Sequence, residues 1–217
     1  MTVRSYRLRR GRLSTSTAEA LDRMGALLVP VDGRPLDVPA LFGRTAPLVV
    51  EIGSGMGEAT AAMAAADPGR DLLAVDVHVQ GLGRLLRRVE EEGLTNVRVA
   101  EGDAVVLLRD MLGVVDEVRV FFPDPWPKAR HVKRRLVSAA FADLVASRLR
   151  PRGLLHVATD WAAYADQVRE VLTAHPAYEV VHSGERWSRP VTRFEQRGLD
   201  AGRPSYDLVV RRRGGTA

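Results

Sequence analysis

Residues 48–58 read LVVEIGSGMGE, an apolar and partly β-branched run that passes into three glycines at alternate positions. The apolar run predicts a buried strand over Leu48–Ile52, and the glycines predict a tight turn that brings the backbone close to a ligand. The alanine-rich residues Glu58–Ala66 then predict a helix that ends at Asp67-Pro68-Gly69. A strand, a glycine turn and a helix in this order predict the first unit of a parallel α/β sheet.

The same alternation continues along the chain. Apolar runs predict further strands at 72–77, 97–100, 114–122 and 154–158. The segments that follow them predict helices at 80–92, 104–111, 132–149 and 161–172. A last pair of strands, predicted to be antiparallel, lies at 178–182 and 206–210. The chain is therefore predicted to be an α/β protein with a doubly wound, mostly parallel Rossmann-like sheet and an antiparallel C-terminal strand.

The segment before the first strand has a different pattern. Residues 1–16 form an arginine-rich arm, residues 17–28 predict a short helix with Thr17 as its N-cap, and the Pro- and Gly-containing residues 29–46 predict a linker. We therefore predict a basic N-terminal appendage that ends at residue 46 and an α/β domain over 47–217.

The charge of the chain favours an anionic partner. Its 217 residues carry a formal net charge of +5, and the sequence pI is about 10.2. Nearly all the cations are arginines, because Lys128 and Lys133 are the only lysines. Arginine binds phosphates and stacks on bases, which favours RNA as the partner. A merely basic surface, or a genome-wide codon bias toward arginine, explains the same composition equally well.

The composition also excludes several kinds of protein. The chain has no cysteine, which excludes disulfides, thiolate metal sites and a cysteine nucleophile. The first residues are charged and lack the apolar segment of a secretory signal. No apolar run approaches the ~20 residues that span a bilayer. We therefore expect a cytoplasmic protein with no membrane partner.

The spacing of the glycine turn argues against a dinucleotide site. The dinucleotide fingerprint places its third glycine three residues after the second, and that position here is Glu58. A carboxylate in the first turn of a helix would repel a pyrophosphate bound there. Glu51 adds another acidic group just before the turn. An acidic rim favours S-adenosylmethionine instead, because that cofactor carries a sulfonium and an ammonium and no phosphate.

Two more carboxylates follow later strands. Asp76 ends the second strand, about twenty residues past the turn, where a carboxylate reaches a ribose hydroxyl pair. Asp103 follows the third strand and could accept a hydrogen bond from the adenine amino group. Each could instead be a turn residue or a helix cap, and Glu51 a solvated charge. Three such carboxylates in order, with Gly53 and Gly55 between them, make cofactor binding the better interpretation.

The fourth strand is followed by FFPDPWPK, residues 121–128. Three prolines predict a stiff, non-helical loop that displays Asp124 and Trp126. Many amino-methylating enzymes hold a base with a similar loop, in which the aromatic ring stacks on the flipped base and the polar group bonds its edge. The alternative is a proline-rich turn with Trp126 packed in the core.

A basic segment comes directly after this loop. Cations beside a candidate base pocket favour phosphate contacts, although a charge run is usually a solvated helix face. We interpret His131 as a phosphate or surface residue rather than a catalyst. The segment consists of Lys128, Arg130, His131, Lys133, Arg134 and Arg135.

Two later motifs complete the candidate site. In Thr159-Asp160-Trp161, Asp160 is a candidate N-cap of the following helix. Residues 192–198 read TRFEQRG and are predicted to lie in an irregular loop. Glu195 in this loop could accept two hydrogen bonds from the N1 and N2 edge of guanine, which presents adjacent donors.

These motifs together resemble one known family, the bacterial tRNA (guanine-N7)-methyltransferases that act on a guanosine of the variable loop. The resemblance covers nearly the whole chain and is carried most specifically by PDPWPK and TRFEQRG. It also includes Arg10-Gly11-Arg12 and the segments EIGSGMG, GDA, FFPDPWPKARHVKRRL and ATDW. It implies a class I methyltransferase fold, S-adenosylmethionine as cofactor and tRNA as partner. Apart from the resemblance, we expect no obligate protein partner and a monomer or homodimer.

The resemblance also implies roles for individual residues. Asp124 is implied to be the catalytic residue, and the cofactor is implied to be bound by Glu51, Asp76, Asp103 and Asp124. The substrate is implied to be contacted by Lys128, Asp160, Thr192, Arg193, Phe194 and Glu195. One position departs from the family, which usually has Glu where this chain has Asp76, so the shorter side chain is expected to reach the ribose directly or through water.

The chemistry of such a reaction asks little of the protein. N7 of guanine has a free lone pair, so no base has to remove a proton and no metal is expected. The enzyme has to align the methyl group with N7, and orientation can contribute about 7–11 kcal/mol. A carboxylate at Asp124 would stabilise the positive charge that develops on the ring.

Three other functions remain as alternatives from the sequence. A methyltransferase for another RNA or for a small molecule has the same fold, although the basic segments disfavour a small molecule. A non-catalytic RNA-binding module is disfavoured by the complete set of strand-end carboxylates. A nucleotide-dependent dehydrogenase is disfavoured by the early third glycine and by Glu58.

Overall fold

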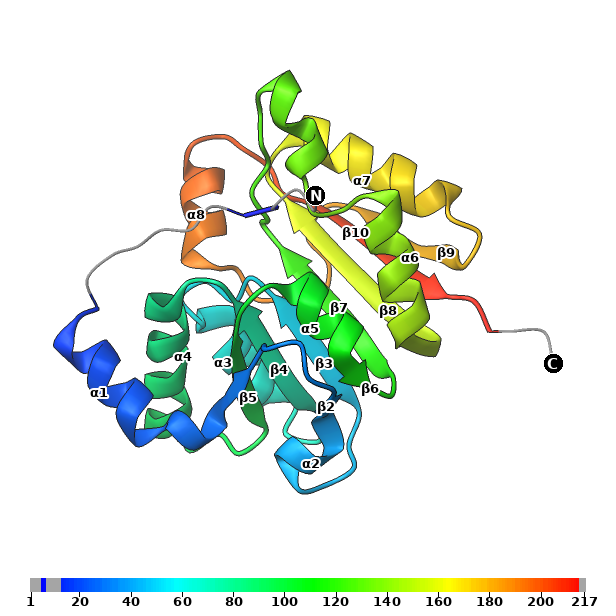
Figure 1. The fold of residues 1–217 in the computed structure, drawn as a ribbon. Coiled ribbons are helices and arrows are strands. Elements are labelled where there is room, and N and C mark those ends of the chain that lie inside the picture. The colour runs from blue at the N-terminus through cyan, green and yellow to red at the C-terminus, as the bar shows by residue number, and fades with distance from the viewer. Residues whose placement is uncertain (1–4, 7–12, 215–217) are drawn as a thin grey trace. The chain divides into compact units, whose positions relative to one another are not determined.

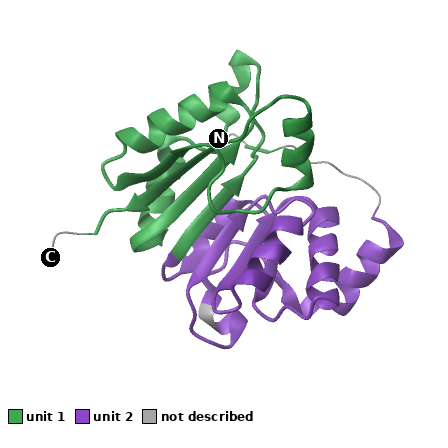
Figure 2. Cartoon of the chain, turned by 180° about the vertical axis from the view of Figure 1, so that it is seen from behind, with its two compact units in different colours: residues 1–7, 116–217 green, residues 8–115 purple. Residues whose placement is uncertain are grey.

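Residues 48–58 fold as the sequence predicts in the computed structural model, which describes residues 5–6 and 13–214 apart from the side chain of Pro39. Strand β3 (Leu48–Ile52) is buried along its whole length and passes through the glycine turn into helix α3 (Glu58–Ala66) (Figure 1). The chain forms two compact units, 8–115 and 1–7 with 116–217 (Figure 2). Arg10-Gly11-Arg12 lies outside the described residues.

The unit of residues 8–115 is built on parallel strands. Their order is β1 (Leu28–Pro30), β5 (Val97–Glu101), β4 (Asp71–Asp76) and β3. All three pairings between these neighbours are parallel. Helices α4 (Val79–Glu91) and α5 (Ala104–Asp110) follow β4 and β5. Parallel order places the carboxyl ends of β3, β4 and β5 at one edge of this sheet.

Helix α4 covers the core of this unit. Its apolar residues recur every three or four positions, so one face is fully buried. The buried side chains on that face are Leu82, Leu85, Leu86 and Val89. They pack with residues of β3, β4 and β5 in one hydrophobic cluster.

The N-terminal segment contains more secondary structure than the sequence predicts. Helix α1 (Thr15–Arg23) is capped by Ser14, whose side chain accepts from the N–H of Thr17, so the prediction of Thr17 as N-cap is wrong. Residues 29–46 are not an unstructured linker. They contain most of β1 and form β2 (Leu36–Asp37), which pairs with β6 (Met111–Leu112), and helix α2 (Val38–Phe42).

The unit that contains residues 116–217 carries the antiparallel strands. Strands β7 (Val115–Phe121), β8 (Leu149–Thr159), β10 (Tyr206–Arg212) and β9 (Tyr178–Gly184) lie in this order. Strand β10 is antiparallel to both β8 and β9, as predicted for the C-terminal pair. Its helices are η2 (Ala129–Arg134), α6 (Ala139–Arg148), α7 (Ala162–Ala174) and α8 (Arg193–Asp200).

Two predictions of secondary structure in this unit are wrong. The single helix expected at 132–149 is divided into η2 and α6, because Arg135 is extended and Ser138 caps α6 by accepting from Phe141 N. The irregular loop expected at 192–198 is instead the start of α8, whose N-cap is Thr192. Within the described residues, no helix has the length and apolar content needed to cross a membrane.

The contact between α1 and α4 depends on Gly83. A Cβ added at Gly83 would lie 2.4 Å from Thr17 Cγ2 and 3.1 Å from Thr17 O. We expect Gly83→Ala to lower the free energy of unfolding, because overpacking costs about 1–3 kcal/mol and better helix propensity returns about 1 kcal/mol. Urea denaturation measures the change. The matched control is Gly25→Ala, where a Cβ would meet nothing within 4 Å; a Gly83→Ala protein more stable than this control would contradict the packing.

Candidate functional site

The glycine turn after β3 leaves an open surface in the unit of residues 8–115. Gly55 and Gly57 have φ of 56° and 75°, which a residue with a side chain rarely adopts. A Cβ at Gly53 or Gly55 would meet nothing within 4 Å. A Cβ at Gly81 of α4, in contrast, would lie 2.0 Å from Gly55 O. The turn is therefore supported closely from one side and open on the other.

Asp76 holds this turn from the end of β4. One oxygen of its buried carboxylate, Oδ2, accepts from Gly55 N at 3.0 Å, and Oδ1 accepts from His78 N at 2.9 Å. Burial raises the pKa of Asp76, and these backbone hydrogen bonds offset part of that rise. Each oxygen keeps a second lone pair for a ribose hydroxyl. Asp76 thus has both the structural role of a turn residue and the position predicted for a cofactor ligand.

Glu51 and Asp103 lie at the ends of the neighbouring strands. Glu51 is only 2% exposed near the end of β3. Asp103 is half-buried and caps α5, with Oδ1 accepting from Val105 N at 2.8 Å. The capping interpretation of Asp103 is therefore correct, and one of its two oxygens is used in this way. Because β3, β4 and β5 are adjacent and parallel, the structure brings the three predicted carboxylates to one edge of the sheet.

These donors fit the predicted cofactor. S-adenosylmethionine offers a ribose diol and an ammonium that carboxylates bind, and the open glycine turn gives backbone access. Glu58, in the first turn of α3, forms an ion pair of 3.4 Å with Arg88. With Glu51, Asp76 and Asp103 at the strand ends, the edge is acidic, which suits a cationic cofactor better than a pyrophosphate.

The loop FFPDPWPK lies in the other unit, after β7. Phe122 and Trp126 both have left-handed backbone conformations, with φ of 50° and 44°. Asp124 between them is half-buried, and no hydrogen bond or ion pair ties its carboxylate to another described residue. Lys128 is exposed at the start of η2. The predicted catalytic carboxylate is therefore displayed on a stiff loop.

Trp126 does not have the predicted role in base stacking. Its side chain is buried, and only 3% of the residue is exposed. The indole Nε1 donates to Ser5 O at 2.9 Å, and the Arg134 guanidinium lies over the ring at 4.9 Å. His131 packs edge-on against the same ring. The interpretation of Trp126 as a packed core residue is correct, because the residue is almost completely buried.

The basic segment divides into exposed and buried cations. Lys128, Arg130, Lys133 and Arg134 are exposed. Arg135 is 7% exposed and donates to Pro125 O at 2.8 Å and to Gln167 Oε1 at 2.7 Å. The prediction that Arg135 binds a phosphate is therefore wrong. Arg135 instead fixes the proline loop by holding the carbonyl of Pro125.

Asp160 follows β8 and lies close to α8. Phe122 N donates to Ala158 O at 2.8 Å, so the ends of β7 and β8 are neighbours. Trp161 rather than Asp160 is the N-cap of α7. The carboxylate of Asp160 accepts from Arg203 Nε at 3.2 Å. The structure thus leaves Asp160 available as a substrate ligand and does not support the capping alternative.

Helix α8 carries the remaining predicted substrate residues. Thr192 Oγ1 accepts from Glu195 N at 3.0 Å and so caps the helix. Arg193 is exposed, and 52% of Phe194 is exposed while its ring lies 5.3 Å from that of Phe122. The helix therefore presents an aromatic face beside the root of the Asp124 loop.

Glu195 is occupied within the protein. Its Oε1 accepts from Arg189 Nη2 at 2.9 Å and from Ser205 Oγ at 2.7 Å, and its Oε2 accepts from Arg189 Nη1 at 2.5 Å. A carboxylate has about four acceptor positions, so this conformation leaves about one. The predicted pair of hydrogen bonds to a guanine edge does not fit this arrangement.

The partner of Glu195 lies outside every sequence motif. Arg189 is 8% exposed and binds Glu195 and Asp207 at once, with Nε–Oδ2 and Nη2–Oδ1 distances to Asp207 of 2.9 and 2.8 Å. His156 Nε2 lies 2.7 Å from Asp207 Oδ2. No motif marks this network, because β8, β10 and the segment before α8 supply its members. The sequence signal near this network is the capping-box spacing of Thr192 and Glu195. It indicates the start of a helix, but not the partner of Glu195.

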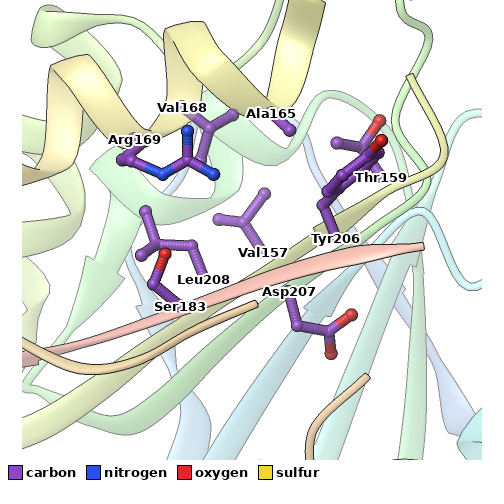
Figure 3. A pocket seen from close by; sticks show the side chains of 9 residues that line it. All are labelled: Val157, Thr159, Ala165, Val168, Arg169, Ser183, Tyr206, Asp207 and Leu208. Carbon is purple, nitrogen blue, oxygen red and sulfur yellow. The ribbon is translucent and has the colours of Figure 1, made fainter. Parts of the chain in front are cut away.

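Asp207 is the buried anion of this network. Burial by itself would raise the pKa of Asp207, but hydrogen bonds from His156 and Arg189 outweigh it and hold the pKa at about 2. A small pocket between α7 and strands β8 to β10 has Asp207 among its lining residues, together with apolar residues, Arg169 and the hydroxyl-bearing Thr159, Ser183 and Tyr206 (Figure 3). Asp207 points away from the other labelled side chains in that view, as strand alternation requires. Its carboxylate therefore lies on the opposite face of the sheet, with Arg189.

The chain is similar to known methyltransferases in both sequence and fold. A family model described as "Putative methyltransferase" matches residues 45–208. The tRNA (guanine-N(7)-)-methyltransferase of Streptomyces avermitilis is 51% identical over 97% of this chain and 75% of its own length. The enzyme of the same name from Streptomyces coelicolor is 50% identical over 97% of this chain and 81% of its own length. Among solved structures, an rRNA methylase from Streptococcus thermophilus has a TM-score of 0.56 at 15% identity, over 77% of this chain and 87% of that one.

The structural likeness confirms the predicted fold class, a mostly parallel α/β sheet of the class I methyltransferase type with antiparallel C-terminal strands. The sequence relatives identify the family more specifically than the fold does. The chain belongs to the family of tRNA (guanine-N(7)-)-methyltransferases, as its motifs indicate.

The buried network makes stability depend on pH. The depressed pKa of Asp207 contributes about 2–3 kcal/mol above pH ~4, and this contribution is lost as pH falls toward the pKa of the folded state. We expect Asp207→Asn to be strongly destabilised at pH 7 and to lack this part of the acid-induced loss. Chemical denaturation at pH 7, 4 and 2.5 measures both effects. Glu179→Gln, which alters a half-exposed ion pair on β9, is the control and should follow the wild-type profile; an Asp207→Asn profile parallel to the wild type would contradict the assignment.

Proposed function

We propose that this protein transfers the methyl group of S-adenosylmethionine to N7 of a guanosine in tRNA. Its relatives of about half identical sequence, matched over nearly the whole chain, carry the name of that activity. The observation that carries the proposal from the structure is the row of carboxylates at the ends of three adjacent parallel strands, beside an open glycine turn. This arrangement favours a cationic nucleoside cofactor over a phosphate-bearing one.

We assign cofactor binding to one edge of the 8–115 unit. Asp76 is placed to accept from the ribose hydroxyls while it holds the turn at Gly55. Asp103 keeps an oxygen for the adenine amino group, and Glu51 contributes negative charge beneath the turn. The cofactor supplies an electrophilic methyl group, and these residues bind and orient it. Asp76 in place of the usual Glu is compatible with this role because its carboxylate already contacts the turn directly.

We assign the base to residues of the other unit. Asp124 holds negative charge where the guanine ring becomes cationic, which stabilises the transition state more than the ground state. N7 needs no deprotonation, so Asp124 has no proton to accept. The predicted contact of Asp124 with the cofactor stays a prediction.

We assign stacking on the base to Phe194 instead of Trp126. A base needs an exposed aromatic face, and the ring of Phe194 is half exposed where the indole of Trp126 is covered. Around this ring we assign substrate contacts to Lys128, Asp160, Thr192 and Arg193. Glu195 is assigned at most one contact with the base. With tRNA as substrate, the enzyme acts in the cytoplasm, and its state as monomer or homodimer stays a prediction.

The proposed reaction is tested with Asp124→Ala. We expect kcat to fall by about 10²–10³-fold, as when one group that stabilises developing charge is removed. An unmodified tRNA transcript and labelled S-adenosylmethionine give the rate, and nucleoside mass spectrometry identifies 7-methylguanosine. Asp166→Ala, which removes an exposed carboxylate on α7, should retain wild-type activity. Absence of 7-methylguanosine with the wild-type protein would refute the function, and a fully active Asp124→Ala would refute the assignment of Asp124.

The exposed half of the basic segment is tested by salt dependence. Arg130→Ala/Lys133→Ala should weaken tRNA binding and flatten the plot of log affinity against log salt by about 1.5, because two phosphate contacts are lost. Filter binding at several salt concentrations gives the slope. Arg135 is left intact because it is buried. The control Arg169→Ala removes an exposed cation of α7, and a slope changed equally by both variants would show no specific role for the basic segment.

A further inference from the structure

We propose that Arg189 is a positioning residue for the methyl-acceptor base, which fixes helix α8 against the root of the Asp124 loop. The proposal rests on the function proposed above and extends it to a side chain that touches neither substrate nor cofactor. Arg189 precedes α8 by four residues, and its guanidinium is buried. Its effect is therefore transmitted through Glu195, Phe194 and Phe122.

The guanidinium binds two carboxylates with two hydrogen bonds each. One pair goes to Glu195, in the first turn of α8, and the other to Asp207 on β10. The planar fork of arginine is suited to such paired contacts. Asp207 is itself held by His156 on β8, within 2.7 Å. The first turn of α8 is thus tied through one side chain to two strands of the sheet.

The network excludes water. The exposed fractions of the side chains of Arg189, Glu195 and Asp207 are 1%, 2% and 0%. Buried charges of this kind contribute little net stability, but the removal of one partner leaves an uncompensated charge and is strongly unfavourable. Such a cluster tolerates only the arrangement in which all members are paired. We infer that this cluster serves to hold α8 in a single position.

The same guanidinium also contacts the loop that carries Asp124. It lies over the rings of Phe121 and Phe122, at 5.4 and 5.0 Å from their centres. Phe122 directly precedes Pro123-Asp124 and has a left-handed backbone, with φ of 50°. The ring of Phe194 lies 5.3 Å from that of Phe122. Arg189 therefore sets the distance between the proposed stacking face and the proposed catalytic carboxylate.

Lysine cannot replace this arrangement. Its ammonium is a point charge that cannot form two paired contacts or lie flat over an aromatic ring. In Arg189→Lys the charge is retained while the geometry is relaxed. A misplacement of about 1 Å can reduce the rate about 10²-fold. We expect that loss in kcat, with KM for tRNA changed less than about threefold because the exposed cations are unaffected.

The experiment compares Arg189→Lys with Arg211→Lys. Arg211 lies on β10, the strand of Asp207, but its ion pair with Glu179 is partly exposed. Steady-state kinetics with a tRNA transcript give kcat and KM, and calorimetry with S-adenosylhomocysteine gives cofactor affinity. The proposal predicts a loss of kcat in Arg189→Lys alone, with cofactor affinity as in the wild type. A kcat of Arg189→Lys within twofold of the wild type would overturn it, and so would an equal loss in both variants.

Two further measurements test the proposal even if the protein does not methylate tRNA or if Arg189→Lys does not fold. Hydrogen exchange of residues 193–200 reports the order of α8 whether or not the protein methylates tRNA, so it separates failure of the network from failure of the proposed function. Faster exchange in Arg189→Lys supports the proposal, and unchanged exchange overturns it. If Arg189→Lys does not fold, Phe194→Ala replaces it, because this ring is half exposed. A loss of kcat at constant KM then supports the role of α8, and wild-type kinetics overturn it.

Discussion

The hydrogen bond that Gly55 N donates to the carboxylate of Asp76 is the contact on which the unit of residues 8–115 depends. It ties the turn after β3 to the end of β4, and the close approach of Gly81 to Gly55 O seats helix α4 on the same turn. The buried carboxylate accepts from two backbone N–H groups, Gly55 N in the turn and His78 N at the start of α4, and so pairs both donors. Parallel pairing of β3, β4 and β5 then fixes where Glu51 and Asp103 lie. A single constraint therefore shapes both the core and the candidate cofactor edge.

The predicted substrate residues are positioned in a different way. Their positions come from buried arginines rather than from backbone pairing. Arg135 holds the proline loop through the carbonyl of Pro125, and Arg189 holds α8 through Glu195. Both guanidinium groups also lie over aromatic rings. The exposed cations of this arginine-rich chain are available for an RNA partner, whereas Arg135 and Arg189 stabilise the structure.

The sequence predicts local features well and distant ones poorly. Strand β3 and helix α3 have the predicted bounds, because apolar runs, glycines and alanines act within a few residues. The break at Arg135 is not evident from the sequence, because Arg135 contacts Pro125, 10 residues before it, and Ala163 and Gln167, 28 and 32 residues after it. Trp126 was misassigned because burial cannot be inferred from a motif. Strand-end positions indicate the roles of Asp76 and Asp103, whereas the substrate roles of Asp160, Thr192 and Arg193 come from the resemblance. Arg189 lies outside every motif.

The hydrogen bond between Trp126 and Ser5 has a consequence for the order of synthesis. Residues 8–115 are continuous, so this unit has all its strands once the ribosome has released about half of the chain. The other unit takes Ser5 from the beginning of the chain and β10 from its end. Ser5 is therefore synthesised well before β10, and its unit is complete only when both are present. The unit of residues 8–115, with the candidate cofactor edge, can form earlier than the unit that contains Asp124.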